Sequence, residues 1–136
     1  MMNGDRQTLS KILEGMQKLL STPGTWIKNY YAVDERGCPV LASSQTACKW
    51  CLSGAINRVA LKESSSHKEY LRKKNLAVRY LAELIYDERL PVEARLNTVV
   101  EWNDKEAGTQ DEVLALIRRA RTELHYERTS PKKANR

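Results

Sequence analysis

The stretch Val99-Val100-Glu101-Trp102-Asn103-Asp104, followed by Gly108-Thr109 and Glu112-Val113-Leu114-Ala115-Leu116-Ile117, decides the fold. Its first part predicts the end of a helix, because Asn and Asp side chains bond the local backbone at helix exits and turns. Thr109 stands three residues before Glu112, which is the spacing of a capping box at the start of a new helix. The sequence therefore predicts a corner between two helices, with Trp102 anchoring that corner in the core.

The residues before this corner show further helical patterns. Apolar residues spaced three and four apart predict helices over 7–20, 45–61, 67–88 and 91–102, before a last helix from 110 to 125 or beyond. Pro91 suits a first helical turn, where no amide donor is needed. Gly54 lies inside the second predicted helix, where glycine costs about 1 kcal/mol relative to alanine. We therefore expect another backbone to pass close to Gly54.

Residues 25–41 break the helical pattern and predict a short β-hairpin. Trp26, Lys28, Tyr30 and Ala32 alternate imperfectly, as in a strand, and the turn at 34–37 contains a glycine suited to a positive φ. Two strands alone are marginal in water, so this element must pack on helices. The predicted fold class is mainly α (α+β), with about five helices packed around a short β-hairpin between the first and second helices. The tryptophans are expected in or near the core, at Trp26, Trp50 and Trp102.

Length and composition predict one small globular domain. The chain has 136 residues, of which 41% are hydrophobic and 29% charged, and we expect a domain over 7–126 and a basic, disordered tail over 127–136. No apolar run approaches the roughly 20 residues that span a bilayer, and the N-terminal residues lack an apolar signal core. These features predict a cytoplasmic protein without a membrane partner.

The formal net charge of +6 directs attention to two basic regions, one within 62–79 and one near the C-terminus. In the last predicted helix, acidic residues at the start and arginines in the second half complement the helix dipole without a ligand. On the predicted helix 67–88, the basic side chains are scattered around the axis, which favours solvation or a broad acidic protein surface over reading of a DNA groove. The candidate contact residues for a partner or nucleic acid are Lys68, Arg72, Lys73, Lys74 and Arg79.

Three cysteines offer the sharpest chemical candidates. Cys48 and Cys51 form a CxxC pair, and Cys38 with His67 could complete a Cys₃His zinc site. Structural zinc sites usually add a second close pair, which the sequence lacks, so the metal hypothesis carries little weight. We expect the pair to lie within a helix, not at the N-terminus of a helix that follows a strand, which argues against thioredoxin-like redox chemistry. No cofactor is expected.

Other catalytic patterns are sparse. Asn103-Asp104 could bind a metal or a hydroxyl, but a structural role at the corner explains it better. The sequence has two histidines, His67 and His125, and no Gly-rich phosphate loop, HExxH motif or nucleophile elbow. The pattern leans away from an enzyme.

Two motifs carry a resemblance to a known family. Trp50-Cys51-Leu52-Ser53-Gly54-Ala55 and Trp102-Asn103-Asp104, followed by Thr109 and Glu112-Val113-Leu114-Ala115-Leu116, resemble W-C-L-x-G-A and W-N-D…T-x-x-E-V-L-A-L of an uncharacterised family of small bacterial and phage domains. The resemblance spans roughly 8–124. It implies no activity, since the family has none assigned. Cys38, Cys48 and the basic stretch 68–74 depart from the family pattern.

Three functional hypotheses remain, in this order. The first is a small non-catalytic protein-binding module, such as a phage or mobile-element accessory protein acting on a host or defence protein. The second is a nucleic-acid-binding domain that uses the basic helix 67–88. The third is a metal-binding protein or enzyme centred on Cys38, Cys48 and Cys51.

Overall fold

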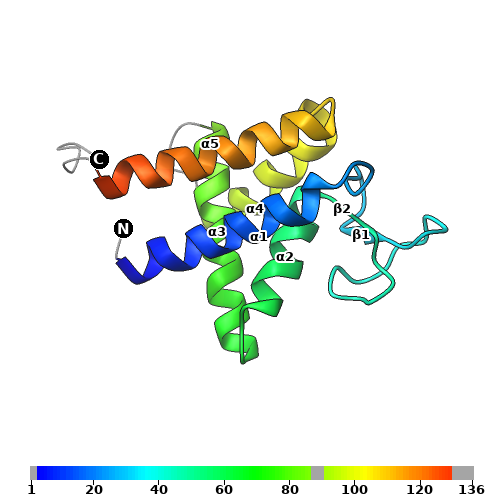
Figure 1. Cartoon of the computed structure of the whole chain (residues 1–136), viewed down its shortest axis with the longest axis horizontal. Helices are drawn as coiled ribbons and strands as arrows, with labels where there is room; N and C mark the ends of the chain where they lie inside the picture. The colour runs from blue at the N-terminus through cyan, green and yellow to red at the C-terminus, as the bar shows by residue number, and fades with distance from the viewer. Residues whose placement is uncertain (1–2, 87–90, 130–136) are drawn as a thin grey trace.

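The computed structural model describes residues 3–86 and 91–129, and within these ranges it contains five α-helices and two short strands (Figure 1). The predicted fold class is confirmed, with the small antiparallel β element between the first two helices. Residues 87–90 and 130–136 lie outside the described ranges, and so do the end of the predicted helix 67–88 and most of the predicted tail. The elements are α1 (Asn3–Ser21), β1 (Ala32–Val33), β2 (Lys49–Trp50), α2 (Leu52–Lys62), α3 (His67–Tyr86), α4 (Val92–Glu101), the π-helical turn η1 (Trp102–Glu106) and α5 (Gln110–Thr129).

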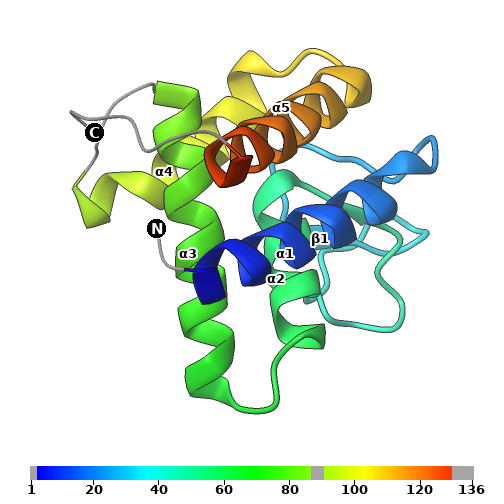
Figure 2. The same cartoon turned by 60° about the vertical axis from the view of Figure 1, so that its left-hand side comes forward.

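The helices pack in crossed directions around a common core. α1 and α5 lie side by side and run in opposite directions, while α3 crosses them (Figures 1 and 2). Residues spaced three and four apart make the facing stripes apolar, and this spacing puts them on one side of each helix. The fully buried stripe of α1 is Leu9, Ile12, Leu13, Met16 and Leu20, and that of α5 includes Val113, Ile117 and Ala120. None of the helices in the described ranges has the length and apolarity needed to cross a membrane.

The start of α2 differs from the prediction of a helix over 45–61, which was wrong before residue 52. Residues 49–50 form β2, and the segment before them consists of turns. Ser44, a residue type favoured at helix N-caps, instead accepts a hydrogen bond from the Thr46 amide (3.2 Å), which stabilises a local turn. The true cap is Cys51, whose extended backbone precedes the helix and whose Sγ accepts from the Gly54 amide (3.2 Å).

The β element pairs differently from a simple hairpin across the 34–37 turn. β1 pairs with β2, with Ala32 opposite Trp50, while the predicted turn produces only a single bridge from Val33 to Pro39. Proline has no amide donor, which limits pairing beyond that bridge. The turn itself forms as expected, with Gly37 at φ +82°.

The three tryptophans lie in or near the core, as predicted. Trp50 is buried, its indole N–H donates to the Ala42 carbonyl (3.0 Å), and the Arg58 guanidinium lies 5.2 Å from its ring centroid. Trp26 and Trp102 are partly buried and pack against the core cluster. All three therefore connect the β element and the corner to the helices.

Candidate protein-binding surface

A buried asparagine organises the corner between α4 and α5. Asn103 lies in η1 and is 1% exposed. Its Oδ1 accepts from the Trp26 indole N–H (2.7 Å) and from the Leu52 amide (3.0 Å). Its Nδ2 donates to the Ile27 carbonyl (3.2 Å) and to Asp104 Oδ1 (2.9 Å). Because an asparagine amide offers two donors and one acceptor oxygen with two lone pairs, this side chain is fully used in joining three segments.

Asp104 extends this network to the loop before β1. Its Oδ1 accepts from the Asn29 amide (2.9 Å). Asn29 has φ 72°, in the left-handed region that asparagine tolerates better than most residues. The Asn103-Asp104 pair thus has the structural role favoured by the sequence, and it holds the backbone directly ahead of Tyr30 and Tyr31.

The other side of the same loop rests on the first turn of α2. The Tyr31 carbonyl accepts from the Cys51 amide (3.2 Å) and lies against Gly54. A Cβ atom built on Gly54 would stand 1.8 Å from that carbonyl oxygen. The backbone approach predicted at Gly54 is therefore confirmed, and Tyr31 is fixed from both sides.

This support leaves large apolar side chains exposed on the β element. Tyr30 is 49%, Tyr31 47% and Leu41 78% exposed. The Val40 amide donates to the Ala32 carbonyl (3.1 Å), which joins the segment that ends at Leu41 to β1. We call Tyr30, Tyr31 and Leu41 the aromatic ribbon. Exposed aromatic side chains on a fixed backbone are typical of protein-binding hot spots.

Tyr70 on α3 lies near the aromatic ribbon. Partial burial raises the pKa of its hydroxyl above the ordinary value, and the neighbouring Tyr31 hydroxyl adds to this increase. The ammonium of Lys74 lies 5.9 Å from the Tyr70 ring centroid.

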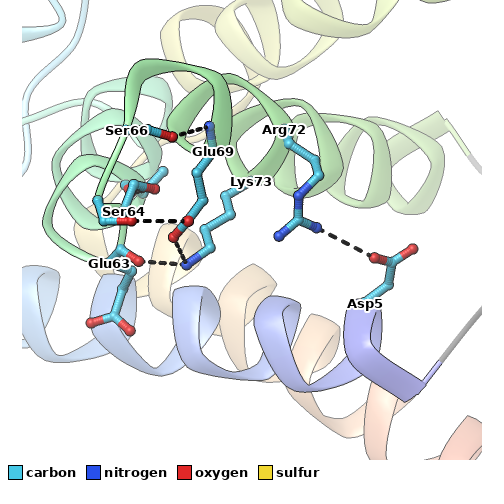
Figure 3. Close-up of polar contacts among 9 residues, drawn as sticks. Asp5, Glu63, Ser64, Ser66, Glu69, Arg72 and Lys73 are labelled. Atoms are coloured by element: carbon cyan, nitrogen blue, oxygen red, sulfur yellow. Dashed lines mark hydrogen bonds and ion pairs between the residues drawn. The ribbon is translucent and has the colours of Figure 1, made fainter.

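Most of the predicted basic contact residues form ion pairs or other contacts within the chain. Lys73 is the clearest case, with its side chain 15% exposed and its ammonium 2.9 Å from the Glu69 carboxylate (Figure 3). The same ammonium donates to the Glu63 carbonyl, and the Ser66 hydroxyl accepts from the Glu69 amide (3.1 Å). The hydrogen bond from Lys73 lowers the pKa of the Glu69 carboxyl. Lys73 thus stabilises the turn between α2 and α3.

The other basic residues of α3 follow a similar pattern. Arg72 pairs with Asp5 of α1 (3.7 Å; Figure 3), and Arg79 pairs with Glu83 (3.5 Å). With Lys74 beside Tyr70, four of the five predicted contact residues have partners inside the described chain. Lys68 is exposed and makes no ion pair with the described acidic residues. These contacts weaken the basic helix as a free cationic surface.

The candidate metal ligands do not converge. Cys38 is exposed, Cys48 half-buried and Cys51 buried. Cys51 precedes α2 and His67 begins α3, so the 11-residue α2, about 16 Å long at 1.5 Å per residue, separates them. Across residues 3–86 and 91–129, no three His, Cys, Asp or Glu side chains are grouped as a metal site would require.

The position of Cys51 corrects the expectation that the CxxC pair lies within a helix. Cys51 caps the N-terminus of α2 directly after β2, a position that often favours a thiolate. Here burial raises the pKa of the Cys51 thiol and outweighs the hydrogen bond from the Gly54 amide. The residue therefore serves as a protonated, buried cap and not as an activated nucleophile.

Sequence reasoning missed the aromatic ribbon as a site. The available signal was the adjacent pair Tyr30-Tyr31 in a segment that leaves the helical pattern, because consecutive side chains there point in different directions and rarely both enter one core. At least one of the two tyrosines must then leave the core. The exposure of both could not be read from that pattern, because it depends on the contacts of Asn29 and Tyr31 with distant segments.

Fold and surface together define a small helical domain that presents an aromatic ribbon supported by a buried asparagine. The family of unknown function DUF6197 matches residues 4–123, and the chain belongs to this family. The resemblance seen in the sequence is confirmed at the level of the family. Comparison with curated proteins and with solved structures finds no match.

Proposed function

We propose that this chain is a small non-catalytic protein-binding module of the cytoplasm, with the aromatic ribbon as its contact surface. The observation that carries the proposal is the exposure of Tyr30, Tyr31 and Leu41 on a backbone fixed by Asn103, Asp104 and Gly54. A fixed backbone reduces the entropy lost on binding, so little of the contact energy is spent on ordering the loop. The net charge of +6 favours a partner with an acidic surface.

The finer part of the proposal is an accessory protein of a phage or mobile element that acts by occupying the surface of a host or defence protein. It rests on the resemblance to small bacterial and phage domains, because family membership alone assigns no activity. Such a role needs no catalytic residues, which agrees with the sparse catalytic patterns of the sequence.

A capture experiment tests the ribbon. Tagged protein is used to capture partners from lysate of its native host, followed by mass spectrometry. The double variant Tyr31→Ser/Leu41→Ser should capture at least about tenfold less partner than the parent. Truncating a hot-spot side chain typically costs about 2 kcal/mol or more of binding free energy. Leu41 is 78% and Tyr31 47% exposed, so the variant should keep most of the thermal stability of the parent.

Tyr86→Ser/Val92→Ser provides the matched control. These positions are 56% and 71% exposed and lie on α3 and α4, so the control likewise removes one tyrosine and one aliphatic side chain, from a different surface. It should capture as much partner as the parent. Equal capture by the ribbon variant and the control would contradict the proposal.

The nucleic-acid alternative is weaker because most of the α3 cations have internal partners. We expect weak, sequence-independent DNA binding at low salt that largely disappears near physiological ionic strength, because few phosphates are neutralised. Fluorescence anisotropy over a salt series measures this. Submicromolar, sequence-selective binding at physiological salt that is abolished by Arg72→Glu/Lys68→Glu would make nucleic acid the leading function.

A further inference from the structure

A second surface, separate from the aromatic ribbon, lies in the groove between α1 and α5. The groove has a volume of about 510 Å³ and lies between two helices that run side by side in opposite directions (Figure 1). Residues of α5 spaced at i, i+3, i+4 and i+7 share one helix face and form one wall. These are Arg118, Arg121, Thr122 and His125, while Ser10 and Gln17 contribute from α1.

One arginine of the groove is held in place by α1. The Arg121 guanidinium donates to Gln17 Oε1 (2.7 Å), and a second nitrogen lies 3.7 Å from the Glu14 carboxylate. Its side chain still has 39% of its surface exposed. Arg121 is therefore ordered, but two of its nitrogens are already engaged by Gln17 and Glu14, so only its remaining exposed edge can meet a further acceptor.

The second arginine differs from those of α3. Arg118 is exposed and makes no ion pair with an acidic side chain in residues 3–86 and 91–129. The lining contains no acidic residue, although Glu14 borders it through Arg121. Leu124, at 2% exposure, supplies an apolar floor. The groove thus combines guanidinium donors with amide, hydroxyl and apolar groups.

From this combination we infer that the α1–α5 groove binds an acidic segment of a partner protein, with Arg118 receiving a carboxylate and the exposed edge of Arg121 beside it. Arginine suits this role because its planar guanidinium matches a carboxylate with two parallel hydrogen bonds. The negative charge of Glu14, beside Arg121, repels a continuous polyphosphate backbone more strongly than a segment with few, spaced carboxylates. The groove therefore favours the acidic segment. The inference rests on this groove and does not depend on the aromatic ribbon.

The test uses the full chain and a fluorescein-labelled peptide of glutamates and leucines, with binding followed by anisotropy. Arg118→Glu should weaken binding at least about tenfold, the size expected for loss of a charged hydrogen bond. Amide shift changes in NMR spectra should concentrate on Ser10, Gln17, Thr122 and His125. A peptide with glutamine in place of glutamate should bind at least about tenfold more weakly for the same reason.

Arg119→Glu is the matched control, because it changes the net charge equally on the same helix but does not line the groove. It should bind the acidic peptide within about twofold of the parent, since an exposed charge outside the contact contributes little. Equal losses in the two variants would overturn the inference in favour of a general electrostatic field. Failure of the parent to bind the peptide at low salt would overturn it too, as would tighter binding of oligothymidine at the same residues.

Discussion

Replacing Gly54 with alanine should destabilise the protein by about 3 kcal/mol or more, at the upper end of the range for overpacked sites. The added Cβ would lie 1.8 Å from the Tyr31 carbonyl oxygen and 2.7 Å from its carbon. Both atoms belong to the backbone, so no side-chain rotation relieves the clash. Either α2 or the loop before β1 must shift, and the shift would strain the hydrogen bond from the Cys51 amide to Tyr31. Urea denaturation followed by circular dichroism measures the effect.

Two other glycines of the chain serve as controls for this prediction. Gly4 of α1 has no neighbouring atom within 4 Å of a built Cβ, so Gly4→Ala should be neutral or stabilise by up to about 1 kcal/mol. Gly15 would meet a methyl group of Val59 at 2.7 Å, and Val59 is a side chain that has some freedom to move. We therefore expect Gly15→Ala to fall between the other two. A Gly54→Ala protein as stable as the Gly4→Ala protein would show that the close approach is not rigid.

The Gly54 site also shows how far sequence reasoning extends. A glycine inside an apolar helical pattern indicated a close backbone contact, but helical propensity alone allowed Gly54→Ala to be stabilising. The identity of the group opposite Gly54 decides whether the alanine substitution stabilises or destabilises the protein. That group is the carbonyl of Tyr31, which is 23 positions earlier and comes from the β element, so no local pattern could reveal it.

The start of α2 was predicted too early from the sequence for a related reason. Ser44 and Thr46 are good caps, and apolar residues near them fit a helical period. The pairing of β2 with β1 and the bond from the Trp50 amide to the Thr25 carbonyl (2.8 Å) favour extended backbone at that point. Long-range strand pairing therefore overrides local helical preference.

The basic residues of α3 show the same limit for the candidate site. Arg72 and Arg79 lie on the exposed side of α3, but neither charge nor helical spacing could reveal that Arg72 reaches Asp5 on α1. Lys73 was a candidate contact residue, yet its ammonium contacts Glu69 and the Glu63 carbonyl at the preceding turn. Charge counting from sequence cannot distinguish a cation that is available to a partner from one already used in folding.

Asn103→Ala should also strongly destabilise the protein, by about 2–6 kcal/mol, because two donors would lose their acceptor at about 1–3 kcal/mol each. These donors are the Trp26 indole N–H and the Leu52 amide. The Leu52 amide lies at the N-terminus of α2, where intrahelical acceptors are missing, so no other group of the helix replaces Asn103. Chemical denaturation compares the variant with the parent.

Asn97→Ala is the matched control, since Asn97 is an exposed asparagine on the neighbouring α4 and should change stability by less than about 0.5 kcal/mol. The two variants remove the same atoms, so their difference reports the buried contacts of Asn103. Amide hydrogen exchange adds a local readout, because loss of Asn103 frees the Ile27 carbonyl and the β element together with the start of α2. Exchange should therefore accelerate first at the Leu52 amide and the Trp26 indole N–H, which lose their acceptor. Uniform acceleration across all helices, with equal stabilities of the two variants, would show that the corner does not hold the ribbon.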